Sequence, residues 1–171
     1  RIMHLGYLML LDRLDSFEGG QTVAAKLLFN ARSAGLETSV DMCSAMHPEF
    51  REIALSALPM IDHLTINEIE AGLTVGEVID PKNSGWLLRT AEQLLSLGVK
   101  QTVTIHTEHG AVCATADGLR LKQPSLKLPV GYSKGATGAG DAFAAGMLYG
   151  LHERFEIQER LRLAVCCAAA C

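Results

Sequence analysis

The chain has 171 residues, of which 49% are hydrophobic and 20% charged, with a net charge of -4 and a pI of about 5.8. This length and hydrophobic content predict one domain with a single buried core. The mild acidity excludes a basic surface for nucleic acid or an anionic membrane, and the apolar runs are too short to span a bilayer.

Five cysteines, at positions 43, 113, 166, 167 and 171, lack the spacing of a disulfide framework or of paired metal knuckles. We therefore expect reduced thiols and a cytoplasmic protein. The chain opens with Arg1 inside an apolar run and ends inside an alanine-rich stretch. We interpret residues 1–171 as a single partial domain, the carboxy-terminal portion of a longer protein.

The first half of the chain alternates predicted strands and helices. Residues 2–11 read as a buried strand that runs into a polar loop over 12–21. A helix is predicted over 22–34, with Gly35 as its C′ residue, followed by a strand over 38–43. Pro48 opens a helix that Pro59 ends, and residues 61–66 form the next strand. A short helical turn then begins at Asn67 and closes near Gly72.

The second half adds antiparallel strands. Ser84 is predicted to cap a helix that ends at Gly98, and a strand follows over 101–107. Two β-like runs, 111–115 and 119–122, flank an Asp-Gly pair that signals a hairpin. A glycine-rich loop over 134–140 leads into a helix from about residue 141 to 151, and a last helix starts near 156. The alternation predicts an α/β/α sandwich around a mostly parallel sheet.

The segment 135–143, Gly-Ala-Thr-Gly-Ala-Gly-Asp-Ala-Phe, has the composition of an anion-binding turn. Its small residues let a ligand approach the backbone, and amide groups at a helix start favour negative charge. Fixed donors of this kind suit phosphoryl transfer, in which charge grows on the transferred group. A carboxylate there, Asp141, is suited to take the proton of an attacking hydroxyl.

One structural alternative remains open for these residues. The glycines could serve only close packing of a helix on a strand, with Asp141 an ordinary acid of a first helical turn. The order of the glycines is neither a Walker A pattern nor G-x-G-x-x-G, so a P-loop or dinucleotide fold is disfavoured.

The sequence Gly138-Ala139-Gly140-Asp141, followed by Ala142, Phe143 and Gly146, resembles the second signature of ribokinase-like (PfkB-type) carbohydrate kinases. Upstream, Asn67-Glu68-Ile69-Glu70 resembles that family's Asn-x-x-Glu motif at a strand end. The resemblance covers nearly the whole chain but only the carboxy-terminal part of the family's fold, so a truncated ribokinase-like sandwich is expected.

The resemblance implies a role for each matched residue. Asp141 would be the catalytic base, and the amides of Gly138, Ala139 and Gly140 would form the anion hole. Asn67 and Glu70 would organise Mg²⁺ and the phosphates of ATP, with Glu70 acting through water, in keeping with the oxygen ligands and retained waters of Mg²⁺. The alternative for this pair is a helix cap with its reciprocal acid, and both roles are compatible. Further nucleotide contacts are expected from His106, Thr107, Gly110 and Thr137.

Three departures from the family pattern bear on these expectations. Gly135-Ala136 stands where many members have Asp-Thr, so activation by potassium is not expected. The stretch Ile105-His106-Thr107 replaces a Thr-x-Gly strand end. The amino-terminal portion that supplies most sugar contacts and a small lid sheet is absent from this chain.

The expected substrates are Mg-ATP and a small sugar or sugar-like alcohol, with no nucleic acid or membrane partner; a homodimer through an exposed sheet edge stays open. A metal site at His106 and His109 is disfavoured because no third ligand is near. Asp41, after a strand, could face the substrate or cap a loop. The rival functions are a non-catalytic nucleotide- or sugar-binding module of the same fold, and a dinucleotide-dependent oxidoreductase, whose glycine-rich turn after the first strand is not seen.

Overall fold

The computed structural model describes residues 1–129, 131–132, 135 and 137–171. Six strands form one sheet in the order β1-β4-β5-β6-β7-β8. Their bounds are Ile2–Leu8 for β1, Glu37–Met42 for β4, His63–Asn67 for β5, Thr102–Thr107 for β6, Gly110–Thr115 for β7 and Arg120–Pro124 for β8. The first four are parallel, and β7 runs antiparallel to both β6 and β8. The predicted mostly parallel sheet with an antiparallel hairpin is confirmed.

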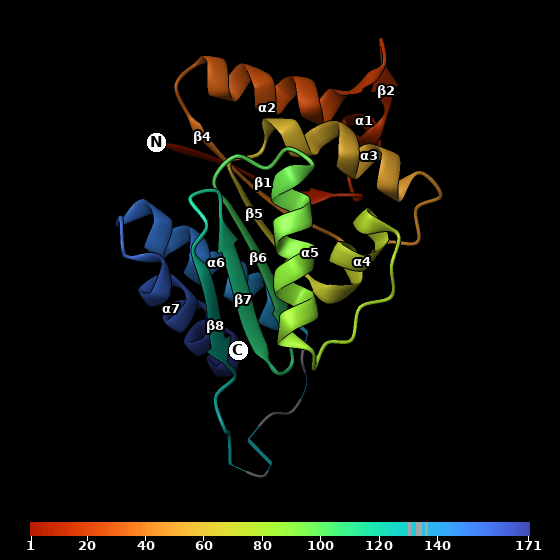
Figure 1. Cartoon of the computed structure of the whole chain (residues 1–171). Coiled ribbons are helices and arrows are strands. Elements are labelled where there is room, and N and C mark those ends of the chain that lie inside the picture. The colour runs from red at the N-terminus through yellow and green to blue at the C-terminus, as the bar shows by residue number, and fades with distance from the viewer. Residues whose placement is uncertain (130, 133–134, 136) are drawn as a thin grey trace.

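Helices cover both faces of this sheet (Figure 1). One face carries α2 (Val23–Ser33), α3 (Phe50–Ala57), α4 (Glu68–Val75) and α5 (Ser84–Ser96), and the other carries α6 (Ala139–His152) and α7 (Ile157–Ala170). Parallel strands that follow one another across a sheet need right-handed crossovers, which place their helices on one face. The α/β/α layering is therefore as predicted.

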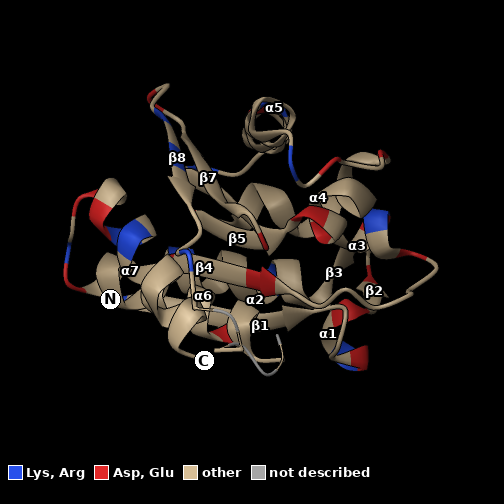
Figure 2. Cartoon of the chain, turned by 90° about the horizontal axis from the view of Figure 1, so that it is seen from below, with Lys and Arg blue, Asp and Glu red and all other residues tan. Residues whose placement is uncertain are grey.

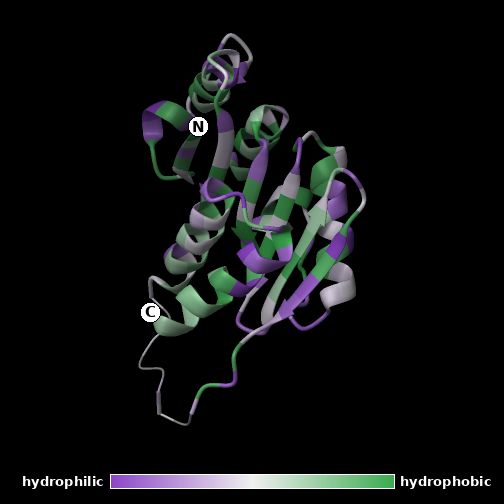
Figure 3. Ribbon diagram, turned by 90° about the vertical axis from the view of Figure 1, so that its left-hand side faces the viewer, coloured by the Kyte–Doolittle hydropathy of each residue, from purple (hydrophilic) through white to green (hydrophobic). Residues whose placement is uncertain are grey.

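The core has one hydrophobic cluster on each face of the sheet. Strand β7 contributes to both, because successive side chains of a strand point to opposite faces. Val112 and Ala114 belong to the larger cluster, beneath α5, whereas Ala111 and Cys113 belong to the smaller one with Phe143 of α6. In Figure 3 green segments alternate with pale and purple ones along the strands. In the part of the chain that the structure describes, no helix combines the length and apolar character of a membrane span.

Three local predictions were wrong. The segment 12–21 is not a plain loop: it holds α1 (Asp12–Asp15) and a small hairpin of β2 (Phe17–Glu18) and β3 (Gln21–Thr22). By contrast, the predicted end of the helix before Pro59 is confirmed, since α3 ends at Ala57 and Pro59 lies in a 3-10 turn, η1 (Leu58–Met60). The helix that starts after Asn67 does not close near Gly72 but continues to Val75, and the cap of α5 is Asn83, not Ser84.

Candidate functional site

The parallel strands β1, β4, β5 and β6 end at the same edge of the sheet, where ligands of open α/β sheets generally bind. Helix α6 begins at this edge: Gly140 lies against His106 of β6, and Asp141 contacts Tyr7 of β1. The first turn of α6 therefore touches strands that are separated in the sheet by β4 and β5. The topology brings together residues from the strand ends and from the glycine-rich segment.

The turn before α6 leaves backbone donors without side-chain caps. Gly138 precedes the helix with φ 86°, in the left-handed region where glycine is favoured, and no side chain caps the helix start among the described residues. The first amides of a helix lack partners within it, and they attract anions when nothing else caps them. The predicted anion-binding turn thus has available donors at Ala139, Gly140 and Asp141. Ala136, within the same predicted segment, lies outside the described residues, as do Val130, Ser133 and Lys134.

Asp141 is exposed in the first turn of α6. The hydroxyl of Tyr7, near the end of β1, donates a hydrogen bond to its Oδ1. This bond raises the pKa of Tyr7 to about 12, with burial and the charges of Asp141 and Asp41 adding to the effect. Sequence reasoning missed Tyr7, because a tyrosine in an apolar strand carries no local signal of a contact 134 residues away.

Asn67 and Glu70 form a reciprocal cap at the start of α4. The Asn67 side chain accepts from the amides of Ile69 and Glu70, each at 2.9 Å, while Glu70 Oε2 accepts from the Asn67 amide at 2.9 Å. Ser44, which was not singled out, joins them: its hydroxyl donates to Glu70 Oε1 at 2.8 Å and accepts from Asn67 Nδ2 at 2.9 Å. Asn67 and Glu70 therefore do form the helix cap that the sequence offered as their alternative role. It holds both side chains at the edge where the magnesium role was predicted.

A third carboxylate, Asp41 at the end of β4, is buried beside this pair. Burial, together with the charges of Glu70 and Asp141, raises the pKa of Asp41 to about 7, although the Met42 amide donates to it at 2.8 Å. Burial also raises the pKa of Glu70, against the hydrogen bonds from Asn67 and Ser44. Figure 2 shows the acidic first turn of α4 in red.

The acidic group around Asp41 and Glu70 is suited to a hydrated divalent cation. The charges of Asp41, Glu70 and Asp141 repel one another, so they favour a bound cation. Mg²⁺ prefers oxygen ligands and keeps several of its waters. Among the residues that the structure describes, no three His, Cys, Asp or Glu side chains are arranged to hold a metal ion together. The residues therefore fit Mg²⁺ held through water better than a closed protein cage.

A cavity of about 290 Å³ lies beside the first turn of α6, between the β6-β7 turn and α7. Five of the predicted site residues line it: His106, Thr107, Gly110, Ala139 and Gly140. The rest of its wall is mostly apolar, from Leu126, Leu128, Phe143, Val165 and alanines of α7. A small apolar cavity with a few polar groups, beside an anion-binding turn, has the character of a nucleobase site.

Three of the residues predicted to contact the nucleotide have structural tasks as well. His106 packs on Phe143, with ring centroids 4.8 Å apart, and burial lowers its pKa to about 4, so it is neutral at pH 7. Gly110 has φ 136°, and a Cβ there would meet Gln123 O of β8 at 2.3 Å. The close approach of β8 therefore requires glycine at position 110. The Thr107 hydroxyl accepts from the His109 amide at 3.0 Å. Thr137 lies in the turn before α6, and its carbonyl is 3.9 Å from Cys171 Sγ.

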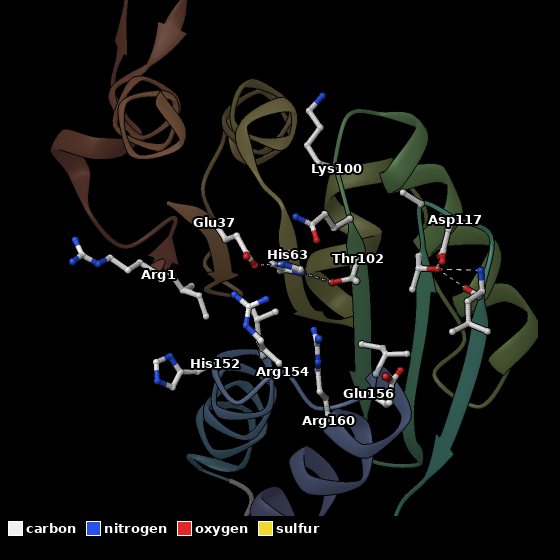
Figure 4. A pocket seen from close by; sticks show the side chains of 17 residues that line it. Arg1, Glu37, His63, Lys100, Thr102, Asp117, His152, Arg154, Glu156 and Arg160 are labelled. Atoms are coloured by element: carbon white, nitrogen blue, oxygen red, sulfur yellow. Dashed lines mark hydrogen bonds and ion pairs between the residues drawn. The ribbon is translucent and has the colours of Figure 1, made fainter. Parts of the chain in front are cut away.

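A larger cavity, of about 760 Å³, lies at the opposite edge of the sheet, where the parallel strands begin. In Figure 4 His63 joins Glu37 and Thr102, with Nε2 3.3 Å from Glu37 Oε2 and Nδ1 2.9 Å from Thr102 Oγ1. Arg154 and Arg160 point towards this group. None of the residues predicted for catalysis or nucleotide binding lines this cavity, so its size alone does not make it the reaction site.

Comparison with known proteins matches residues 18–171 to the model of the pfkB family carbohydrate kinases. Among solved structures, the chain is similar to *Arabidopsis thaliana* ribokinase complexed with ribose and ATP, with a TM-score of 0.70 and 23% identity over 87% of this chain and 45% of that one. It is also similar to *Anopheles gambiae* adenosine kinase in complex with P1,P4-di(adenosine-5) tetraphosphate, with a TM-score of 0.72 and 20% identity over 85% of this chain and 44% of that one.

A third similar structure is phosphofructokinase-2 from *Escherichia coli*, in complex with substrates and products, with a TM-score of 0.70 and 20% identity. It is matched over 86% of this chain and 45% of its own. The chain thus spans less than half the length of each of these three proteins. Because the family model matches nearly the whole chain, and the fold agrees with the same group of proteins, the chain belongs to the pfkB family of carbohydrate kinases.

Proposed function

We propose that the full-length protein transfers the terminal phosphoryl group of ATP to a hydroxyl of a sugar or sugar-like molecule. Asp141 accepts the hydroxyl proton as the new oxygen–phosphorus bond forms and the bond to ADP breaks. The amides of the Gly138–Gly140 turn stabilise the charge on the transferred group. Bound Mg²⁺ would neutralise phosphate charge, with Glu70 and Asn67 positioned to hold its water shell.

The observation that carries this proposal is the position of the α6 start between two different environments. On one side lies the small, mostly apolar cavity against β6 and β7, suited to a nucleobase. On the other side Asp141 contacts Tyr7 of the edge strand β1. The acceptor would bind here with the help of the part of the protein that lies outside this chain. A phosphoryl group that passes from donor to acceptor would cross the uncapped amides of the turn.

The experiment is a screen of the full-length protein for ADP release with Mg-ATP over sugars, sugar phosphates and nucleosides. We expect at least one acceptor to raise ADP release well above the rate without acceptor, and chelation of Mg²⁺ to abolish the increase. The alternative, a non-catalytic binding module of the same fold, predicts ATP or sugar binding with no acceptor-dependent ADP in the same screen. We expect the present chain alone to be inactive or very weak, and the complete enzyme to work in the cytoplasm.

A further inference from the structure

The contact between Tyr7 and Asp141 joins an edge strand of the sheet to the start of the helix at the candidate reaction centre. The Tyr7 ring is half-buried, and its hydroxyl donates to a single carboxylate oxygen, Oδ1. A hydrogen bond from a neutral donor to an ionised acceptor is among the stronger ones and fixes the orientation of both groups. Among the described residues no hydrogen bond reaches the second oxygen of Asp141, which leaves it to an acceptor hydroxyl.

The surroundings of this phenol are acidic. Besides Asp141 of α6, the charged or titratable groups that act on Tyr7 are Asp41 of β4 and Cys43 just after β4. All three raise the pKa of the phenol, so it stays protonated, and remains a donor, through the neutral pH range.

We propose that Tyr7 is a positioning residue for Asp141, holding one carboxylate oxygen so that the other faces the acceptor hydroxyl; this rests on the proposed function. A base fixed in one orientation before the acceptor arrives costs no reorganisation during the reaction. Tyr7 does not exchange a proton with substrate. It acts only through Asp141, and a purely structural tyrosine at the end of β1 would leave the pH dependence of turnover unchanged.

The first test compares Tyr7→Phe with wild type in the full-length protein, using the acceptor found in the ADP screen. Tyr149→Phe is the matched control, because Tyr149 is exposed on α6 and packs only against Phe155 among described aromatic rings. We expect kcat to fall about 10–100-fold in Tyr7→Phe, the loss typical of one hydrogen bond to a charged group, with KM for ATP unchanged. The acid limb of the kcat profile should also move, because Tyr7 acts through the group that accepts the proton.

An unchanged kcat and acid limb in a folded Tyr7→Phe protein would overturn the role of Tyr7 while leaving the proposed phosphoryl transfer intact. A second measurement does not depend on turnover or on how well that variant folds. With tyrosine labelled with ¹³C at Cζ, the Tyr7 resonance of the wild type should resist ionisation at alkaline pH at which an ordinary phenol ionises. In Asp141→Asn the Tyr7 transition should move to lower pH. If it does not move, the contact is absent and the proposal fails; if it moves but no acceptor yields ADP, the proposed function fails and the positioning role with it.

Discussion

Asp41 shows how the fold changes the chemistry of a single residue. From the sequence, this aspartate could either face a substrate or cap a loop. In the structure it is buried at the end of β4, with its pKa raised to about 7 by burial and by the charges of Glu70 and Asp141. A carboxyl group whose pKa is higher in the folded state than in the unfolded state binds protons more tightly when folded. Its contribution to stability is therefore fully present below about pH 4 and is lost as pH rises through about 7.

We therefore predict that Asp41→Asn removes part of the pH dependence of stability. The raised pKa corresponds to at most about 4 kcal/mol once Asp41 is ionised. Between pH 5 and pH 8.5, the wild-type free energy of unfolding should fall by about 2–3 kcal/mol more than that of the variant. Denaturant unfolding of this chain in metal-free buffer measures it, with Asp80→Asn, an exposed carboxylate, as control. Equal pH dependence in wild type and Asp41→Asn would contradict the assignment.

The site residues differ in how much the sequence could reveal. Asp141, Asn67 and Glu70 stand in local motifs, so their positions could be predicted and the structure places them at one sheet edge. Tyr7 and Ser44 could not, because each contacts the site through the order of the strands and not through a pattern of neighbours. Whether Asp141 acts as a base stays a prediction.

At the scale of elements, the cap of α4 combines a structural and a proposed functional task. Asn67 and Asn83 both cap helices, of α4 and α5 respectively, but only Asn67 lies at the candidate site. We predict that Asn67→Ala and Asn83→Ala each lower the free energy of unfolding by about 1 kcal/mol, the usual cost of a lost cap. Only Asn67→Ala should also lower acceptor-dependent ADP formation by the full-length protein. If both variants formed ADP at the same rate, Asn67 would act only as a helix cap.

The packing of α6 on α7 supports the helix that carries Asp141. A Cβ at Gly146 would lie 2.7 Å from Ala164 Cα and 3.0 Å from Ala164 N, both backbone atoms that cannot rotate away. Gly146→Ala should therefore destabilise the chain by about 1–3 kcal/mol. Gly85→Ala on α5 is the control: its nearest atom is Asn83 Oδ1 at 3.4 Å, and alanine favours helix by up to about 1 kcal/mol. Denaturant unfolding measures both. If the two substitutions changed the free energy of unfolding in the same direction, this packing argument would be refuted.

The errors in the predicted elements have two physical causes. Gly72 was expected to end its helix, but it is a packing glycine: a Cβ there would meet Glu77 O at 2.4 Å. The αL residue that ends α4 is Gly76, with φ 82°. A sequence shows that a glycine is present, but not whether it serves close packing or a left-handed helix end. The two-residue strands of 17–22 were missed because so short an element has no periodicity to detect.

At the scale of the whole molecule, the mostly parallel sheet, its antiparallel hairpin and the two helical layers could be predicted, because alternating strands and helices permit few arrangements. The acceptor site could not, since this chain spans less than half of the similar kinases and β1 lies at an edge of its sheet. The side proposed for the nucleotide is more complete, with its cavity formed by β6, β7, α6 and α7 together with the segment after β8.

The central claim is that the first turn of α6 and the carboxylate of Asp141 act together on a phosphoryl group and its acceptor. The most direct measurement is acceptor-dependent ADP formation by the full-length protein and its Asp141→Asn variant, alongside ATP binding to both. We predict that turnover falls about 10²–10⁴-fold in the variant, the range for loss of a general base, while ATP affinity is retained. Turnover at the wild-type rate in Asp141→Asn would contradict the account.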